Sequence, residues 1–412
     1  MRVIYLHQYF NTPTMSGGTR SFELGRRLVD MGHEVHIVTS WREERGTSGW
    51  FETAEQGLNV HWLPVRYSNR MGYADRVRAF VTFAMRSAGR AAALDGDVIL
   101  ATSTPLTIAI PAVWASRRSR VPMVFEVRDS WPTVPVALGV VKNPIVIALA
   151  RALEWTAYHA SAEVIALSPP MADDVVARGY ERARVTVIPN GCDLDLMATG
   201  NSERLLESHP WIRARPVIAY VGTIGRMNGV DIVVELATAL HAHGDPFTFV
   251  VVGDGRERAR IEAEAAQRGL LNDTVRFIGP VPKSEVPDWL HATKATLMTL
   301  DGPPEVAKYA VQNKFFDSLA AGRPVLSNLK GYVSKIAETE GVGLTLDPVP
   351  NVAAAELVRR FETGWLDQAG ERAAALARSR FSRDGHAKEL EAVLHRAIAR
   401  HRGQGRSQVT DS

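Results

Sequence analysis

Positively charged residues that could bind phosphate stand in two segments of the second half of the chain. Lys314 and Asp317 lie three apart in a short predicted helix that ends at Gly322 and Pro324, and they therefore share one of its faces. Lys314 could bind a diphosphate there while Asp317 accepts hydrogen bonds from ribose hydroxyls. Arg226, in a glycine-rich loop, offers a second charge suited to phosphate oxygens. The alternatives are a surface ion pair and a solvated loop arginine.

Loops in the first half carry further candidate residues. Gly17 and Gly18 stand at the start of a predicted helix, where backbone N–H groups and the helix dipole favour an anion or an acceptor group. A tight turn is the alternative for these glycines. Arg128 and Asp129 follow a predicted strand, and they could bind a sugar hydroxyl or form an ion pair that holds the loop. The Asn190-Gly pair is first of all a turn signal.

Composition sets bounds on these possibilities. The chain has 412 residues, which predicts two domains, and its net charge of +3 is too small to indicate nucleic acid as a partner. The single cysteine excludes an internal disulfide framework and makes a cysteine metal site implausible. The N-terminus reads directly into a strand, and no apolar run approaches the length of a membrane span. We therefore expect a cytoplasmic protein.

The elements that must position these residues follow from an alternation of apolar runs and helical segments. Runs rich in Val and Ile recur through both halves, which is typical of parallel sheets covered by helices on both faces. They lie at 3–6, 35–38, 98–100, 123–127, 164–167 and 185–188, and then at 217–221, 247–252, 275–278, 296–300 and 324–327. The predicted fold class is α/β, with two doubly wound Rossmann-like domains facing a cleft.

The predicted domain boundary falls in the polar segment 201–210, which lacks strand character. We predict an N-terminal domain over 1–205, a C-terminal domain over 206–385, a terminal helix over 386–402 and a disordered tail over 403–412. Ligands of such sheets bind outside the carboxyl ends of the strands. A nicotinamide fingerprint is absent from these loops, which argues against a dehydrogenase.

In this order, the motifs resemble glycosyltransferase family 4, the retaining enzymes of the GT-B fold, over nearly the whole chain. The resemblance is carried by Ser16-Gly17-Gly18-Thr19-Arg20, Gly32-His33-Glu34-Val35, Val187-Ile188-Pro189-Asn190-Gly191-Cys192-Asp193, Val251-Val252-Gly253-Asp254-Gly255 and Phe316-Asp317-Ser318-Leu319-Ala320-Ala321-Gly322-Arg323-Pro324-Val325. The segments 127–132 and 312–317 look most similar to the branch that builds bacterial surface polysaccharides and O-antigens, which includes fucosamine transferases.

The resemblance implies roles for individual residues. Arg226 and Lys314 would bind the donor diphosphate near Gly18, Asp317 would hold the ribose, and backbone near Val281 would meet the base. Asp129 would orient the acceptor or sugar, and Arg226, Lys314 and Asp129 form the implied catalytic set. The remaining substrate-binding positions are Gly17, Arg128, Asn190, Gly253, Glu305, Tyr309 and Asn313.

Three positions depart from the family pattern. The family commonly has two glutamates separated by seven residues, whereas this chain has Asp317 at the second and Tyr309 at the first. Glu305 and Tyr309 are therefore the candidates for contact with the donor sugar. Asn228 stands where a lysine usually follows the phosphate arginine, so Lys314 would replace that charge. Arg128 stands where many relatives have histidine, which argues against a general base there.

The family implies transfer of a hexosyl or N-acetylhexosaminyl group from a nucleotide diphosphate-sugar, with UDP-sugars the first expectation, to a lipid-linked or oligosaccharide acceptor. Fixed positive charge would stabilise the departing diphosphate, without a cofactor or a catalytic metal. The segment 70–90 interleaves apolar residues with arginines, which suits peripheral contact with anionic lipid at the inner face of the plasma membrane, or simple packing on the sheet. The rival functions are a GT-B nucleotide-sugar epimerase and a non-catalytic sugar-nucleotide-binding protein.

Overall fold

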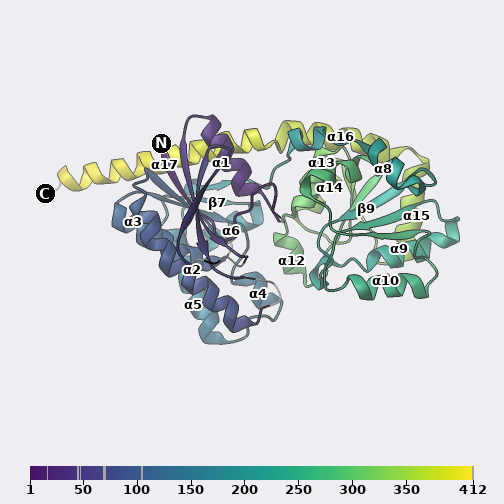
Figure 1. The fold of residues 1–412 in the computed structure, drawn as a ribbon, viewed down its shortest axis with the longest axis horizontal. Coiled ribbons are helices and arrows are strands. Elements are labelled where there is room, and N and C mark those ends of the chain that lie inside the picture. Colours follow the sequence, from purple (N-terminus) through teal and green to yellow (C-terminus); the bar gives the residue numbers. More distant parts are fainter. Residues whose placement is uncertain (16, 44–45, 47, 68–70, 104, 411–412) are drawn as a thin grey trace. The chain divides into compact units, whose positions relative to one another are not determined.

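The structure, a computed structural model, describes residues 1–15, 17–43, 46, 48–67, 71–103 and 105–410, with backbone only for 73 and 404–410. It divides into two compact units (Figure 1). The N-terminal unit comprises Met1–Pro189 and Asp384–Ser412, and the C-terminal unit comprises Asn190–Arg383. No helix among the described residues is long and apolar enough to cross a membrane.

An eight-stranded sheet forms the centre of the N-terminal unit, in the order β3-β4-β2-β1-β5-β6-β7-β8. All neighbouring strands are parallel except β3 and β4. The strands are β1 (Arg2–Leu6), β2 (Glu34–Trp41), β3 (Phe51–Glu55), β4 (Leu58–Pro64), β5 (Val98–Thr102), β6 (Met123–Val127), β7 (Glu163–Ala166) and β8 (Val185–Val187). Strands β5, β6 and β7 are buried throughout and β1 is buried from Val3 on, which matches the apolar runs that predicted them.

Seven α-helices of the described chain belong to this unit: α1 (Arg20–Asp30), α2 (Tyr73–Ala93), α3 (Ala109–Ser119), α4 (Thr133–Ala137), α5 (Pro144–His159), α6 (Pro169–Ala177) and α17 (Arg383–Thr410). Local sequence explains where two of them begin. Asn143 caps α5 by accepting from the backbone N–H of Ile145 at 2.9 Å, with Pro144 at the first helical position. Ser168 caps α6 in the same way.

The hairpin of β3 and β4 is an element that the sequence analysis missed. Gln56 and Gly57 connect the two strands, both with positive φ, as a two-residue hairpin turn requires. The residues of β3 alternate between half-buried and exposed, but its sequence does not alternate between apolar and polar residues, so periodicity gave no signal for it. The hairpin extends the sheet beyond β2, at the end away from the candidate site.

The C-terminal unit has a six-stranded, all-parallel sheet in the order β11-β10-β9-β12-β13-β14. The strands are β9 (Val217–Val221), β10 (Thr248–Val252), β11 (Val275–Ile278), β12 (Ala295–Met298), β13 (Val325–Ser327) and β14 (Gly343–Thr345). The α-helices are α7 (Leu194–Ala198), α8 (Ser202–Ser208), α9 (Ile232–Leu240), α10 (Arg258–Gln267), α11 (Val286–His291), α12 (Pro304–Tyr309), α13 (Asn313–Ala320), α14 (Tyr332–Thr339), α15 (Pro350–Glu362) and α16 (Trp365–Arg380). The predicted pair of doubly wound domains is confirmed.

The division between the units lies earlier than the predicted boundary at 205. Helices α7 and α8 pack on α11 of the C-terminal unit, and Leu205 is buried in its core beside Trp289. The Asn201 backbone N–H also donates to Asp288 at 2.6 Å. The polar residues that suggested a linker lie on the solvent-exposed face of α8. The buried Leu205 on its other face assigns this helix to the C-terminal unit.

The predicted terminal helix over 386–402 is longer and belongs to the first unit. Its apolar residues, among them Leu390 and Leu394, join the core cluster that contains Val3 and Val35. The predicted disordered tail is wrong as far as Thr410, because α17 continues to that residue. Propagating a helix that packing has already nucleated is far less costly than starting one, even through Gly403 and Gly405.

Each sheet has one point where the strand order reverses. In the N-terminal unit it lies between β1 and β5, and in the C-terminal unit between β9 and β12. Ligands of open α/β sheets bind at the carboxyl ends of strands beside such a point. The loops that follow β1, β5, β9 and β12 are therefore the places where binding residues should gather.

Candidate functional site

The loop after β9 packs backbone to backbone against the loop after β10. Gly222 N donates to the Val252 carbonyl at 2.9 Å, and Ile224 N donates to the Asp254 carbonyl at 2.9 Å. Gly253 has φ +146°, and a Cβ on it would lie 2.0 Å from the Gly222 carbonyl oxygen. Gly253, predicted as a substrate-binding residue, thus has a structural role, because only a residue without a side chain allows the two loops to pack this closely.

Lys314 extends from the start of α13 towards the loop after β9. Its ammonium lies 3.9 Å from the centre of the Tyr220 ring and beside Gly222. The nitrogen itself is buried, and no described residue hydrogen bonds to it. Burial lowers the pKa of Lys314 to about 7, because an ammonium removed from water loses its hydration. The structure therefore places a buried, unpaired cation at the carboxyl edge of the sheet.

Arg226 begins a short 3₁₀ helix, Arg226–Asn228, that follows Gly225. Its side chain is exposed, and it forms no ion pair or hydrogen bond with any residue that the structure describes. Asn228, where the family usually has lysine, accepts from the Gly225 N–H at 3.2 Å through its side chain, and its carbonyl accepts from Thr299 Oγ1 at 2.5 Å. Asn228 therefore shapes the loop that presents Arg226.

Asp317 has a partner that the sequence analysis missed. Its carboxylate accepts from the Lys283 ammonium at 2.6 Å, with only 13% of the Asp317 side chain exposed. No pair between Lys314 and Asp317 exists in the structure, so the alternative of an ion pair between them is wrong. The Lys283 pair fastens the loop after β11, which contains Val281, to α13. Val281 itself is half-buried against two small apolar clusters.

The two candidates for donor-sugar contact lie on α12. Glu305 is exposed in the first turn, whereas Tyr309 is buried. The Tyr309 hydroxyl accepts from the Lys308 ammonium at 2.8 Å. Tyr309 thus fills interior space where the family has an acid, and Glu305 is the carboxylate of this helix that solvent reaches.

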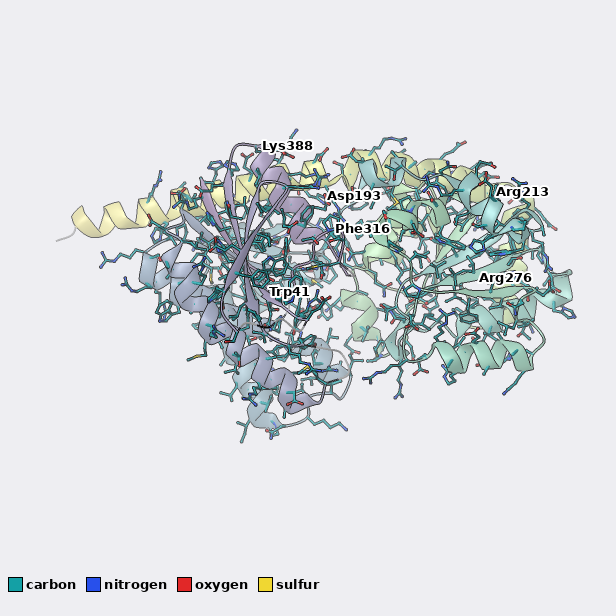
Figure 2. All side chains as sticks on the ribbon, in the orientation of Figure 1. Trp41, Asp193, Arg213, Arg276, Phe316 and Lys388 are labelled. Atoms are coloured by element: carbon teal, nitrogen blue, oxygen red, sulfur yellow. The ribbon has the colours of Figure 1, made fainter. Side chains whose placement is uncertain are left out.

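Asn190 is placed as a brace for the segment that leads into α13. It is buried, and its side-chain amide donates to the Val311 carbonyl at 2.7 Å. Its side-chain oxygen is buried without a partner among the described residues. Asn313 is the first residue of α13, directly before Lys314. Behind them, α13 buries Phe315, Phe316 and Leu319, and Figure 2 labels Phe316 within the C-terminal unit.

At the N-terminal sheet, the loop after β1 folds against Gly17 and Gly18. The Asn11 amide donates to the Gly18 carbonyl at 3.3 Å. Gly17 has φ +129°, and a Cβ there would lie 2.6 Å from the same amide nitrogen. Ser16, which belongs to the same motif, lies outside the described residues. The tight-turn alternative for the two glycines thus holds, and it leaves their N–H groups at the entrance to α1.

A buried ion pair joins α1 to β6. Both Arg20 and Glu126 are almost fully buried, and Arg20 donates to Glu126 at 2.8 Å and 3.0 Å. Arg20 also donates to the carbonyls of Ile188 and Pro189. Burial would raise the pKa of Glu126, but the charges of Arg20 and Arg128 outweigh burial and hold it below its ordinary value. The sequence analysis assigned neither residue a role.

Arg128 lies beside His7 at the carboxyl edge. The Arg128 guanidinium donates to His7 Nε2 at 3.2 Å, so the proton of the neutral ring sits on Nδ1. Burial, with the nearby charges of Arg128 and Arg42, lowers the pKa of His7 well below its ordinary value. Asp129, the next residue, is exposed. His7 directly follows β1, beside the point where the strand order reverses, and this position could have identified it as a candidate from the sequence.

Several buried polar groups in this region have no hydrogen-bond partner among the described residues, and two of them lie at the end of β1. These two are His7 Nδ1 and the side-chain amide of Gln8. The Gln8 carbonyl is occupied, because it accepts from the hydroxyl of Ser40 at 2.6 Å. Buried groups left without partners are rare in folded proteins. A neutral, hydroxyl-bearing ligand at this edge would satisfy these two groups.

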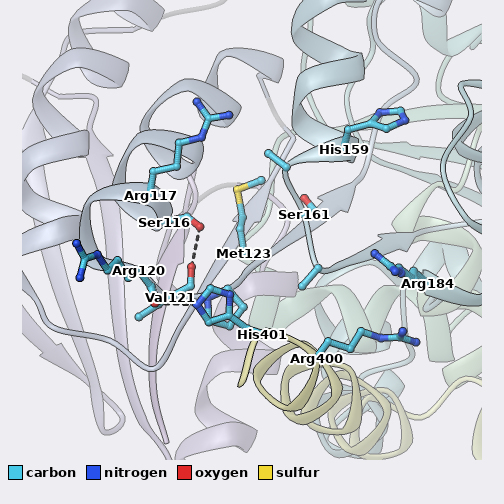
Figure 3. Close-up of a pocket in the computed structure, with 13 residues that line it drawn as sticks. Ser116, Arg117, Arg120, Val121, Met123, His159, Ser161, Arg184, Arg400 and His401 are labelled. Atoms are coloured by element: carbon cyan, nitrogen blue, oxygen red, sulfur yellow. Dashed lines mark hydrogen bonds between the residues drawn. The ribbon is translucent and has the colours of Figure 1, made fainter. Parts of the chain in front are cut away.

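Two further cavities are lined by other residues. One of about 390 Å³ sits at the amino ends of β6 and β7, and Figure 3 shows Arg117, Arg120, Arg184, Arg400 and His401 around it. Arg400 is already paired with Glu163 at 2.7 Å. The other, of about 330 Å³, follows β9 and β12 in the C-terminal unit and is lined by Asp231, Glu235, Asp301 and Asp347. The acidic lining of the second cavity disfavours a diphosphate.

Among the described residues, His33, Glu391 and His395 bring their ligand atoms within 4.8 Å of one another. His33 immediately precedes β2, so this group lies at the amino edge of the N-terminal sheet, opposite the candidate residues. His33 Nε2 is already within 2.6 Å of Glu391. The group ties α17 to the sheet.

Comparison with known proteins agrees with this arrangement. Residues 17–191 match the model of a glycosyl transferase 4-like domain, and residues 215–379 match that of glycosyl transferases group 1. The chain is a glycosyltransferase of this GT4-like, group 1 family. It is 26% identical over 278 residues to the colanic acid biosynthesis glycosyl transferase WcaI of Escherichia coli K12, covering 63% of this chain and 68% of the relative.

Other relatives of this glycosyltransferase extend the comparison. The 2-deoxystreptamine glucosyltransferase of Streptomyces kanamyceticus is 31% identical over 263 residues, covering 59% of this chain and 65% of the relative. The solved structure of Alr3699/HepE from Anabaena, in complex with UDP, superposes with a TM-score of 0.68 at 16% identity, covering 96% of this chain and 100% of that chain. These structural neighbours confirm the predicted GT-B fold.

Proposed function

We propose that this glycosyltransferase moves a hexosyl or N-acetylhexosaminyl group from a UDP-sugar to a lipid-linked glycan acceptor in bacterial surface-polysaccharide biosynthesis. The single observation that carries the donor assignment is Lys314, a buried ammonium that contacts the Tyr220 ring but has no hydrogen-bond partner and no acid among the described residues. Leaving a buried charge unpaired is costly, and a diphosphate would remove that cost. The complexes of HepE with UDP and of related chains with nucleotide-sugars support the same donor class.

Our proposed donor site uses residues of the C-terminal unit. Lys314 and the exposed Arg226 bind the diphosphate, and Asp317 accepts from the ribose with the carboxylate oxygen that Lys283 leaves open. Val281 stands on the loop that Lys283 fastens, so its backbone meets the base. Glu305 takes the contact with the donor sugar, because Tyr309 is buried and already paired with Lys308.

Chemically, the proposed reaction cleaves the bond between the anomeric carbon and the diphosphate oxygen. The positive charges of Lys314 and Arg226 stabilise the negative charge that develops on that oxygen. The acceptor hydroxyl attacks the same face of the sugar and passes its proton to the departing phosphate, which gives retention without an enzyme base. Asp129 orients the acceptor, and the Gln8 amide and His7 Nδ1–H are the buried groups that would meet its hydroxyls. This route needs neither a cofactor nor a catalytic metal.

The acceptor and its place in the cell are the part of the proposal that rests on relatives. WcaI is named for colanic acid biosynthesis, and another structural neighbour, WaaG, for lipopolysaccharide biosynthesis. A lipid-linked acceptor of this kind would place the enzyme at the inner face of the plasma membrane.

The test is incubation of the protein with labelled UDP- and GDP-sugars and a bacterial lipid extract. Label that moves into the organic phase from a UDP-sugar supports the proposal. Release of an epimerised free donor would instead identify a GT-B epimerase. An intact donor, with tight UDP binding and no labelled lipid, would identify a sugar-nucleotide-binding protein.

A further inference from the structure

Residues 133–152, which we call the apolar hairpin, are mostly apolar, yet apart from one residue they are exposed or only half-buried. The hairpin comprises α4, the connection that follows it and the first half of α5. Its charged residues are Lys142 and Arg151, and it contains no acid. Val141 is its one buried residue. The rest of the unit therefore leaves much of the apolar surface of this segment uncovered.

The exposure is concentrated rather than scattered. Val140, Ile145 and Leu149 are exposed to 64%, 68% and 66%, and Ile145 and Leu149 lie four apart on one face of α5. Single exposed apolar residues are ordinary on protein surfaces, but a contiguous group marks an interaction surface.

The apolar hairpin is held in place from its far end. Glu154, Ala157 and Tyr158 are the buried residues of α5, and Glu154 pairs with Arg178 at 3.0 Å. At the near end, Asn143 caps the helix. The first half of α5 is therefore a formed helix that presents apolar residues to its surroundings, and partner binding would order little further chain.

We propose that the apolar hairpin inserts into the interface of an anionic bilayer. Its net charge is positive, so it complements acidic lipid headgroups. Trp155, 52% exposed, continues the same helix, and tryptophan favours the level of the headgroups. A second copy of this chain is a poorer occupant, because a symmetric contact would place Lys142 and Arg151 of one copy near the same cations of the other.

The inference deepens the proposed function, on whose lipid-linked acceptor it rests. The apolar hairpin begins four residues after Asp129, so the bilayer contact lies close in sequence to the proposed acceptor residues. Helix α2, where the sequence suggested lipid contact, presents a narrower stripe of Val77, Val81 and Met85. Its other face packs in the interior through Phe83, as the alternative held, and Arg70 lies outside the described residues.

The experiment compares the full-length chain with the double variant Ile145→Glu/Leu149→Glu. Each protein is sedimented with vesicles of phosphatidylcholine and phosphatidylglycerol, and with vesicles of phosphatidylcholine alone. The wild type should bind the anionic vesicles more strongly, and the variant should lose at least about tenfold in partition coefficient. Val349→Glu/Val352→Glu, which replaces residues 52% and 51% exposed in the C-terminal unit, is the matched control and should bind like the wild type.

UDP binding, measured by calorimetry, should be the same in all three proteins, which shows that the variants are folded. Equal vesicle binding by wild type and Ile145→Glu/Leu149→Glu overturns the inference. So does a wild-type dimer in sedimentation velocity that the variant dissociates, with no vesicle binding by either. Vesicle binding without any sugar transfer sinks the proposed function alone, whereas transfer to a water-soluble acceptor analogue without vesicle binding sinks the inference alone.

Discussion

The carboxyl edges of the two sheets differ in whether their positively charged side chains are paired with other residues. In the N-terminal unit, Arg20 is fully engaged by Glu126 and two backbone carbonyls, and Arg128 donates to His7. In the C-terminal unit, Lys314 is buried without a partner among the described residues, and Arg226 is exposed and unpaired. Both edges contain cations, but at the N-terminal edge protein groups accept hydrogen bonds from them, whereas at the C-terminal edge no described residue accepts one from Lys314 or Arg226.

The difference shows how to distinguish cations that hold the fold together from cations that bind a ligand. A cation that the fold has already paired holds loops in place, as Arg20 does between α1, β6 and the end of the unit. A buried cation that the fold leaves unpaired reduces stability, and it persists where a ligand supplies the missing anion. The comparison assigns the anionic donor to the C-terminal unit and leaves neutral hydroxyls for the N-terminal edge.

The largest effect is expected from breaking the paired edge. Glu126→Gln leaves the Arg20 charge buried with a neutral partner, and it should lower the free energy of unfolding by about 3–5 kcal/mol. Thermal unfolding measures the loss, and calorimetry should show UDP binding unchanged. The double variant Arg20→Met/Glu126→Gln should recover part of the stability. An unchanged melting temperature in Glu126→Gln would show that the pair does not support the unit.

Removing the unpaired charge should have the opposite effect on stability. Lys314→Met should lower kcat by about 10²–10³-fold, as expected for loss of a group that stabilises developing negative charge. It should also raise the free energy of unfolding of the unliganded protein by about 1–3 kcal/mol, because a buried unpaired group disappears.

The control is Lys335→Met, which removes an exposed lysine of α14 and should change neither quantity. A Lys314→Met variant that is destabilised and fully active would show that Lys314 is structural.

The low pKa of Lys314 predicts the pH dependence of donor binding. Its pKa of about 7 lies below its ordinary value, so the ammonium loses its proton as the pH rises through 7 in the unliganded protein. A diphosphate binds the protonated form, so affinity for UDP should fall above pH 7, by up to about tenfold per pH unit. Calorimetry across this range provides the measurement. Lys314→Arg, which stays charged, should abolish the slope, and a slope that survives in this variant contradicts the assignment.

The smallest effect concerns the ribose. Asp317→Asn should weaken UDP binding by about 3–10-fold, the contribution of one hydrogen bond, and should affect inorganic pyrophosphate much less. Lys283→Met releases the same carboxylate and tests whether the loop that contains Val281 must be fastened. If Asp317→Asn weakens pyrophosphate as much as UDP, Asp317 acts on the diphosphate or on the fold rather than on the ribose.

Much of the fold was predictable because parallel strands buried on both faces are continuous apolar runs. The eleven runs of the sequence analysis correspond to eleven of the strands, and the missed ones are β3, β4 and β14. The predicted domain boundary was wrong because a few individual contacts decide where the division falls. A single side chain, Leu205, and the hydrogen bond from Asn201 to Asp288 attach a polar helix to the C-terminal unit, and neither is visible in composition.

By itself, the sequence determined the fold class, the carboxyl-edge loops and the residue types that could bind a nucleotide-sugar. It could not say which charges are paired, because partners such as Lys283 and Asp317, or Arg20 and Glu126, are far apart in the chain. Pairing and burial depend on distances that only the tertiary structure sets. In the sequence, Lys314 and Asp317 could form an ion pair with each other at the surface. The fold separates them into a paired acid and an unpaired, buried cation.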